Sequence, residues 1–153
     1  MQETKENKKL KLAQLEKSSL HCGWSTSFGL AETTEAGYPS AGVAISVKKH
    51  IGMKELKWQP PDDLQGRIRA TWIGAMLKGG CVVITIYPWD TEKLSARNIR
   101  LLDTLLQLTK TIHGPWIIGG DWNMIPDVLI TAGWVARLRG VVCAPKHDTC
   151  NSN

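Results

Sequence analysis

The stretch Trp116-Ile-Ile-Gly-Gly-Asp121-Trp-Asn123 is the part of this 153-residue chain that most strongly indicates its fold. Its apolar half predicts a short, buried central strand over 116–119, and the two glycines let the backbone turn sharply after it. A strand that runs into Gly-Gly-Asp-x-Asn places two polar side chains at its carboxyl end, where open α/β sheets bind ligands. The stretch therefore predicts an α/β protein with a candidate site at Asp121 and Asn123.

Both polar residues of this turn are suited to phosphate chemistry. Asp121 can orient or deprotonate a water molecule, and the Asn123 amide can donate to a phosphate oxygen while its carbonyl accepts from a neighbour. Asp and Asn are also common in plain turns, so these residues by themselves support a site and a turn equally.

The rest of the chain alternates between patterns typical of strands and of helices. A Lys-rich amphipathic helix is expected over 5–19, with Leu10, Ala13 and Leu15 on its apolar side. Strands are expected over 23–30 and 42–47, and these two are expected to pair with each other. Two more are expected over 67–75 and 81–87, joined by a tight turn at 78–80. A last strand is expected over 141–144. Helices are expected over 91–113 and, shorter, over 127–134; 32–40 reads as a loop and 51–65 as irregular or an edge. Layers of helices and strands follow from this order.

The composition indicates which partners and compartments to expect. The formal charge of +5 favours an anionic partner only mildly, and the seven Trp can stack on bases or pack in the core. Four Cys without CxxC spacing indicate free thiols, with zinc held by Cys143, His147 and Cys150 plus His21 or Cys22 as a weaker alternative. No stretch approaches the roughly 20 apolar residues of a membrane helix, and the polar N-terminus lacks a signal-peptide core. We therefore expect an intracellular protein, nuclear or cytoplasmic, with no membrane partner.

Two further residues have the chemistry of a phosphate site. Glu3, in Gln2-Glu3-Thr4-Lys5, is a possible Mg²⁺ ligand, since hard cations are held by one or two carboxylates with waters and substrate oxygens. Tyr87 ends the most apolar strand, before Pro88, and its phenol can donate to a phosphate oxygen. Taken singly, a charged N-terminus and a packing tyrosine are the more common explanations.

The order and separation of these segments resemble one protein family. The segments are Gln2-Glu3-Thr4-Lys5, Gly42-Val-Ala-Ile-Ser-Val47, Ile84-Thr-Ile-Tyr87-Pro88, the helix that contains Arg97, and Ile117-Ile-Gly-Gly-Asp121-Trp-Asn123. Together they resemble the endonuclease/exonuclease/phosphatase superfamily, which includes exonuclease III-like abasic-site endonucleases, deoxyribonuclease I and retrotransposon endonuclease domains. The likeness spans nearly all of the chain and is loose beyond Trp134, where 140–145 has a retroelement-like pattern.

The resemblance implies a fold and a set of roles. The fold would be part of a four-layered α/β sandwich, two β-sheets flanked by helices, with residues 1–153 as a single partial domain. Glu3 falls on the family's metal-binding glutamate, Asp121 on the aspartate that activates the attacking water, Asn123 on the phosphate-contacting asparagine, and Tyr87 on the tyrosine that holds the scissile phosphate. The implied activity is phosphodiester hydrolysis with Mg²⁺ or Mn²⁺, on nucleic acid, DNA more than RNA.

The chain also departs from the family pattern. The family's first, asparagine-bearing strand and its C-terminal third, with the Ser-Asp-His strand, have no counterpart here. Because residues of such a site act as a unit, we expect the isolated chain to lack Mg²⁺-dependent nuclease activity. The alternatives are a non-catalytic nucleic-acid-binding or interaction fragment and, within the family, a lipid or inositol phosphatase. Substrate and oligomeric state are not determined by these motifs.

Overall fold

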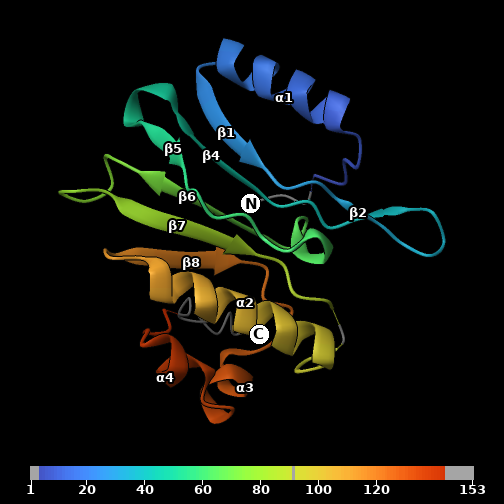
Figure 1. Cartoon of the computed structure of the whole chain (residues 1–153), viewed down its shortest axis with the longest axis vertical. Coiled ribbons are helices and arrows are strands. Elements are labelled where there is room, and N and C mark those ends of the chain that lie inside the picture. The colour runs from blue at the N-terminus through green and yellow to red at the C-terminus, as the bar shows by residue number, and fades with distance from the viewer. Residues whose placement is uncertain (1–3, 91, 144–153) are drawn as a thin grey trace, which may run out of the picture.

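The computed structural model of the chain describes residues 4–90 and 92–143 and is a mixed α/β protein (Figure 1). In chain order its elements are α1 (Lys9–His21), β1 (Trp24–Phe28), β2 (Glu32–Thr33), β3 (Pro39–Ser40), β4 (Ala44–Lys48), β5 (Met53–Glu55), β6 (Ile68–Ile73), β7 (Cys81–Ile86), α2 (Ala96–Thr111), β8 (Trp116–Gly120), α3 (Pro126–Thr131) and α4 (Trp134–Leu138), with 3-10 turns at Lys49–Ile51 and Asp62–Leu64. Over these residues the strands form a four-stranded sheet, ordered β5-β6-β7-β8, and the two-stranded sheets β1-β4 and β2-β3. The expected α/β class is confirmed.

Strand β7 lies inside the larger sheet, as its β-branched run predicts. It pairs antiparallel with β6 and parallel with β8. Ile84, Thr85 and Ile86 are fully buried, which confirms a strand covered on both faces. The expected turn before it is also present, with both Gly79 and Gly80 at positive φ, 92° and 85°.

Helix α2 covers one face of the larger sheet and builds most of the core. The Ser95 hydroxyl accepts a hydrogen bond from the Asn98 N–H (3.3 Å), so the helix begins at Ala96, later than expected. The expected apolar side, Leu102, Leu105, Leu106 and Thr109, is buried, whereas Ile99 is 39% exposed. The side chains of Leu101 and Leu108 complete the contact with the sheet.

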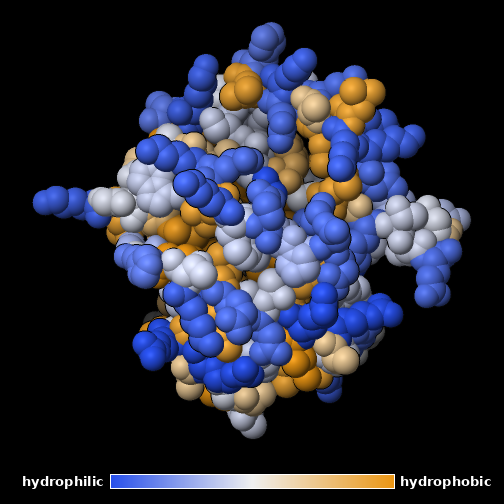
Figure 2. Space-filling view, viewed as in Figure 1, coloured by the Kyte–Doolittle hydropathy of each residue, from blue (hydrophilic) through white to orange (hydrophobic). Residues whose placement is uncertain are grey.

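The sheet β1-β4 lies between α1 and the larger sheet (Figure 1), and its antiparallel pairing is as expected. The predicted apolar side of α1 was wrong. Leu12 is the buried residue of this helix, while Leu10 and Leu15 are 75% and 44% exposed. A two-stranded sheet offers a helix little area to cover, and patches of apolar surface remain over α1 in Figure 2.

Three other expectations need correction. Within the described ranges β8 pairs with β7 alone, so it is an edge strand rather than a buried central one, and Ile117 is 46% exposed. Residues 32–40 form the small β2-β3 hairpin instead of a plain loop. The segment 51–65, expected to be irregular or an edge, does contain an edge strand, β5, and so agrees with its expectation. Of the strand expected over 141–144, residues 141–143 form none, because no described strand pairs with them and Val141 is 90% exposed, and Ala144 lies outside the described residues.

Candidate functional site

The parallel pairing of β7 and β8 brings two of the sequence motifs to one edge of the sheet. Ile86 is opposite Gly120, so Tyr87 and Asp121 are the residues that follow the two strands at the same end. This is the carboxyl end of both strands, the edge at which open α/β sheets bind ligands. The structure thus brings together the Tyr87 and Asp121 segments, which the sequence had only placed in order.

Gly120 is required by the close approach of the two strands at this edge. Its φ is +155°, and a Cβ atom at this position would overlap the carbonyl oxygen of Ile86. A larger residue would therefore push β8 away from β7 just before Asp121.

Asp121 and Asn123 form the turn that leaves β8. The Asn123 N–H donates to Asp121 Oδ1 at 3.2 Å, and Asn123 has a φ of +50°, which Asn tolerates better than most residues. The Asn123 side chain also reaches across to the other strand, since Nδ2 donates to the Pro88 carbonyl oxygen at 2.9 Å. Asp121 is exposed and Asn123 half-buried. The expected turn role of both residues is therefore present, and the same contacts hold them beside Tyr87.

Sequence reasoning missed a buried arginine beneath this edge. Arg67 is 3% exposed, and its Nε and Nη2 atoms each lie 3.2 Å from a carboxylate oxygen of Glu32. Its guanidinium carbon lies 4.4 Å from the Trp89 ring centroid and 5.3 Å from that of Tyr87. The Tyr87 N–H donates to the Arg67 carbonyl oxygen at 2.8 Å. An arginine at the start of an alternating strand was the available signal, but its partner Glu32 is distant in sequence.

A hollow of about 240 Å³ adjoins this cluster on the side of α2. It is lined by Glu32, Asp63, Leu64, Trp89, Arg97 and Arg100. Arg100 donates twice to the Asp63 carboxylate, at 2.8 and 3.0 Å. This bond and the charge of Arg100 hold the pKa of Asp63 below its ordinary value, and the same bond raises the pKa of Arg100. The arginines here are already partnered, because Arg97 also lies 3.8 Å from Glu92.

The N-terminal motif is described only from Thr4, so Glu3 lies outside the described residues. The Thr4 N–H donates to the Gly42 carbonyl oxygen at 2.7 Å, and the Gly42 N–H donates to the Gly66 carbonyl oxygen at 3.0 Å. The Thr4 hydroxyl is buried without a hydrogen-bond partner among the described atoms. Backbone bonds therefore connect the Thr4 and Gly42 segments to Gly66, the residue before Arg67, and so to the edge that carries Tyr87.

No metal centre is formed by the described side chains alone. Over 4–90 and 92–143 there is no group of three or more His, Cys, Asp or Glu that could hold an ion. Glu3, the residue expected to bind Mg²⁺, lies outside these ranges. For the zinc alternative, Cys22 and Cys143 are exposed free thiols, and His147 and Cys150 lie outside the described residues.

Comparison of the chain with protein-family models, with curated proteins and with solved structures gave no match. None of the helices in the described part of the chain has the length and apolar character needed to cross a membrane.

Proposed function

We propose that the chain is a metal-dependent phosphodiester hydrolase domain of the endonuclease type, related to the endonuclease/exonuclease/phosphatase superfamily. The observation that carries the proposal is the bond from Asn123 Nδ2 to the Pro88 carbonyl oxygen, 2.9 Å long. It joins two motifs that the sequence separates by 35 residues, at the sheet edge where ligands bind in open α/β folds. A plain turn after β8 does not require this contact.

The roles follow from exposure and hydrogen bonding at this edge. The exposed carboxylate of Asp121 orients or deprotonates the attacking water. The Asn123 amide has two N–H donors, so one can hold Pro88 while the other donates to a phosphate oxygen. The Tyr87 hydroxyl is the second donor to the phosphate.

Glu3 would supply a hard oxygen donor of the kind that Mg²⁺ or Mn²⁺ prefers. A bound ion would neutralise charge on the phosphate as the leaving oxygen departs. The arrangement of α1, the β1-β4 sheet, the larger sheet and α2 in successive layers supports the four-layered sandwich of this superfamily (Figure 1). We propose nucleic acid as the substrate, DNA before RNA, on the basis of the net charge of +5; a lipid or inositol phosphate is the alternative within the superfamily.

A second candidate is a non-catalytic nucleic-acid-binding domain, and pairs of cations with indole rings favour it. Lys48 Nζ lies 4.1 Å from the Trp24 ring centroid, and Trp24 is 37% exposed. Such pairs can stack on bases and contact phosphates without any hydrolysis.

Retention of a labelled oligonucleotide by the chain, with Mg²⁺ or with a chelator, tests the proposal. We expect Mg²⁺ to strengthen retention, and Asp121→Asn and Asn123→Ala each to weaken the Mg²⁺-dependent part by about tenfold. Asp127→Asn, an exposed carboxylate on α3, is the matched control and should behave as the unaltered chain.

The same samples, run on a gel, report cleavage. Cleavage that is lost in Asp121→Asn would identify a working hydrolase and overturn the expectation that the isolated chain is inactive. Retention that weakens with salt, but changes neither on addition of Mg²⁺ nor in Asp121→Asn, would instead reject the hydrolase and favour the non-catalytic binding domain.

A further inference from the structure

A second hollow lies at the opposite end of β7 and β8, where the two strands begin. It has a volume of about 590 Å³, which is within the range of about 300–1,000 Å³ typical of small-molecule sites. Its apolar wall includes Trp58 and Trp72, with Val82 from β7 and Leu108 from α2. None of the motifs that indicated phosphodiester hydrolysis contributes to it.

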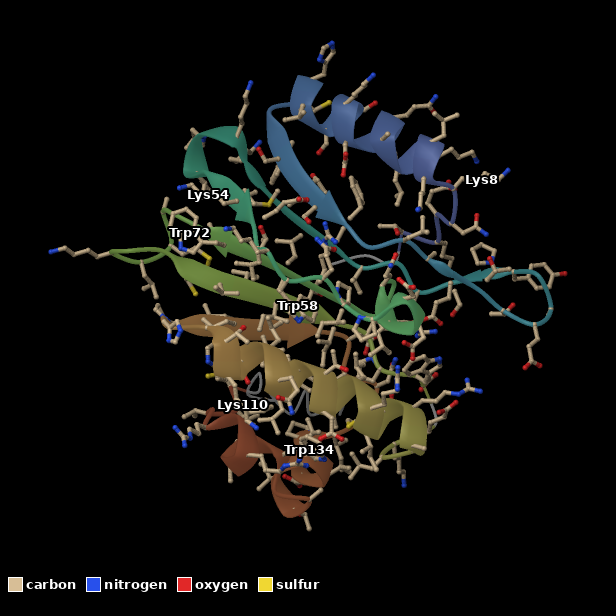
Figure 3. All side chains as sticks on the ribbon, viewed as in Figure 1. Lys8, Lys54, Trp58, Trp72, Lys110 and Trp134 are labelled. Carbon is tan, nitrogen blue, oxygen red and sulfur yellow. The ribbon has the colours of Figure 1, made fainter. Side chains whose placement is uncertain are left out.

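The indole of Trp72 is held in place by its surroundings. Gly80 has a φ of +85°, and a Cβ atom there would overlap the indole, so the ring packs directly on the glycine backbone. Lys54, opposite Trp72 on the neighbouring strand, has its Nζ 4.9 Å from the ring centroid. Figure 3 shows these two side chains next to each other, with Trp58 over the larger sheet. This wall of the hollow is therefore preformed in the absence of a ligand.

The polar residues around the hollow favour an anion. Lys57 and His113 are part of its lining, Lys54 stands over Trp72, and the lining includes no Asp or Glu. An uncharged apolar ligand would not use the lysines, whereas a planar ring that carries a phosphate would use both the indoles and the lysines.

We propose that this hollow binds a nucleotide, with the base against Trp58 and Trp72 and the phosphate at Lys54 and Lys57. Base–indole stacking supplies the apolar contact and tolerates any base. The nucleotide comes either free in solution or as part of single-stranded nucleic acid; both present the same chemistry. The site lies at the opposite end of β7 and β8 from Asp121, and the proposal does not depend on the hydrolase proposal.

Calorimetric titration of the full chain with adenosine 5′-monophosphate, adenosine and ribose 5-phosphate tests the site. We expect the monophosphate to bind more tightly than either part, because the ring and the phosphate each have a partner. Trp58→Ala should weaken monophosphate binding by about tenfold, in line with the loss of one stacked base.

Two surface variants with matched controls make the test independent of folding defects. Thr111→Tyr places a ring in the hollow from the last turn of α2 and should abolish binding, while Gln107→Tyr, exposed on the same helix outside the lining, should not. Lys57→Gln should weaken the monophosphate but not adenosine, and Lys110→Gln, an exposed lysine of α2 outside the lining, should change neither (Figure 3).

Each possible result of these titrations leads to a different conclusion about the site. Competition by a short single-stranded oligonucleotide assigns the site to nucleic acid, and its failure to compete assigns the site to a free nucleotide. Monophosphate binding that is undetectable at millimolar concentration, or equal in Thr111→Tyr and Gln107→Tyr, overturns the proposal. The titrations contain a chelator and no Mg²⁺, so this result and the Mg²⁺-dependent retention that tests the hydrolase can fail separately.

Discussion

The two ends of the β7-β8 pair differ sharply, although the same parallel ladder connects them. At the carboxyl end the backbones approach so closely that only Gly120 fits, and Asn123 closes the gap to Pro88. At the amino end, where the Val82 N–H donates to the Pro115 carbonyl oxygen at 3.0 Å, the two strands border the hollow lined by Trp58 and Trp72. Backbone hydrogen bonds join the strands at both ends, but polar turn residues flank the carboxyl end and indole rings flank the amino end.

The comparison shows that register alone does not decide where a sheet can bind a ligand. Val82 to Ile86 pair continuously with Trp116 to Gly120. What differs is the residues that flank the ladder: polar turn residues lie at one end, and bulky aromatic residues line a hollow at the other. Substitutions at the two ends, and at the ion pairs beside them, test this contrast.

Gly120→Ala should have the largest effect on stability. The added Cβ would overlap the Ile86 carbonyl oxygen, which is backbone and cannot rotate away. We expect the free energy of unfolding to fall by about 3 kcal/mol, measured by urea denaturation.

Gly79→Ala is the matched control at the amino end. Gly79 also has a positive φ, 92°, but a Cβ there would meet nothing within 4 Å. In Gly79→Ala the free energy of unfolding should fall by about 1 kcal/mol, because only the backbone conformation is strained. Equal losses in the two variants would show that the close approach at the carboxyl end is not a constraint.

Arg67→Leu should have the next largest effect. The change leaves the Glu32 carboxylate, whose side chain is 26% exposed, without the cation that lies 3.2 Å away. Because Arg67 is only 4% exposed as a side chain, we expect a loss of about 2–3 kcal/mol in the free energy of unfolding. The double variant with Glu32→Gln should recover part of this loss, since it removes the unpaired charge.

Arg97→Leu provides the comparison for Arg67→Leu, because the Arg97 side chain is 65% exposed and its partner Glu92 lies 3.8 Å away. Its effect should be about 0.5 kcal/mol or less. A loss as large as that of Arg67→Leu would contradict the importance assigned to burial.

The smallest effect concerns the dependence of stability on pH. Arg100 lowers the pKa of Asp63 below 3.8, so this pair contributes stability above that value and loses it as pH falls through the folded-state pKa. Both side chains are more than half exposed, at 60% and 54%, so the contribution is small. Arg100→Gln should lower the denaturation midpoint slightly at neutral pH, and the difference from the unaltered chain should vanish in acid. A difference that grows in acid would have the wrong sign.

Much of the local structure could be predicted from the sequence. The β-branched run at 81–87, the turn at Gly79-Gly80 and the helical leucine spacing within 91–113 each reflect interactions within a few residues. The strand and the turn are present, and the helix is present over the shorter range Ala96–Thr111. Predictions failed where a distant partner decides. Leu12 replaced Leu10 and Leu15 as the buried residue of α1, and β8 is an edge strand, because both outcomes depend on which surfaces pack against these elements.

The same distinction holds for the candidate site. The sequence by itself determined the α/β class, the turn at Asp121 and Asn123, and the order of the motifs, since local backbone preferences and side-chain chemistry are enough for these. Only the tertiary structure decided that Asn123 meets Pro88 and Arg67 meets Glu32, partners that are each 35 residues apart. It alone also produced the hollow at the other end of the strands. Such contacts depend on how whole strands and helices pack, and no short stretch of residues specifies that packing.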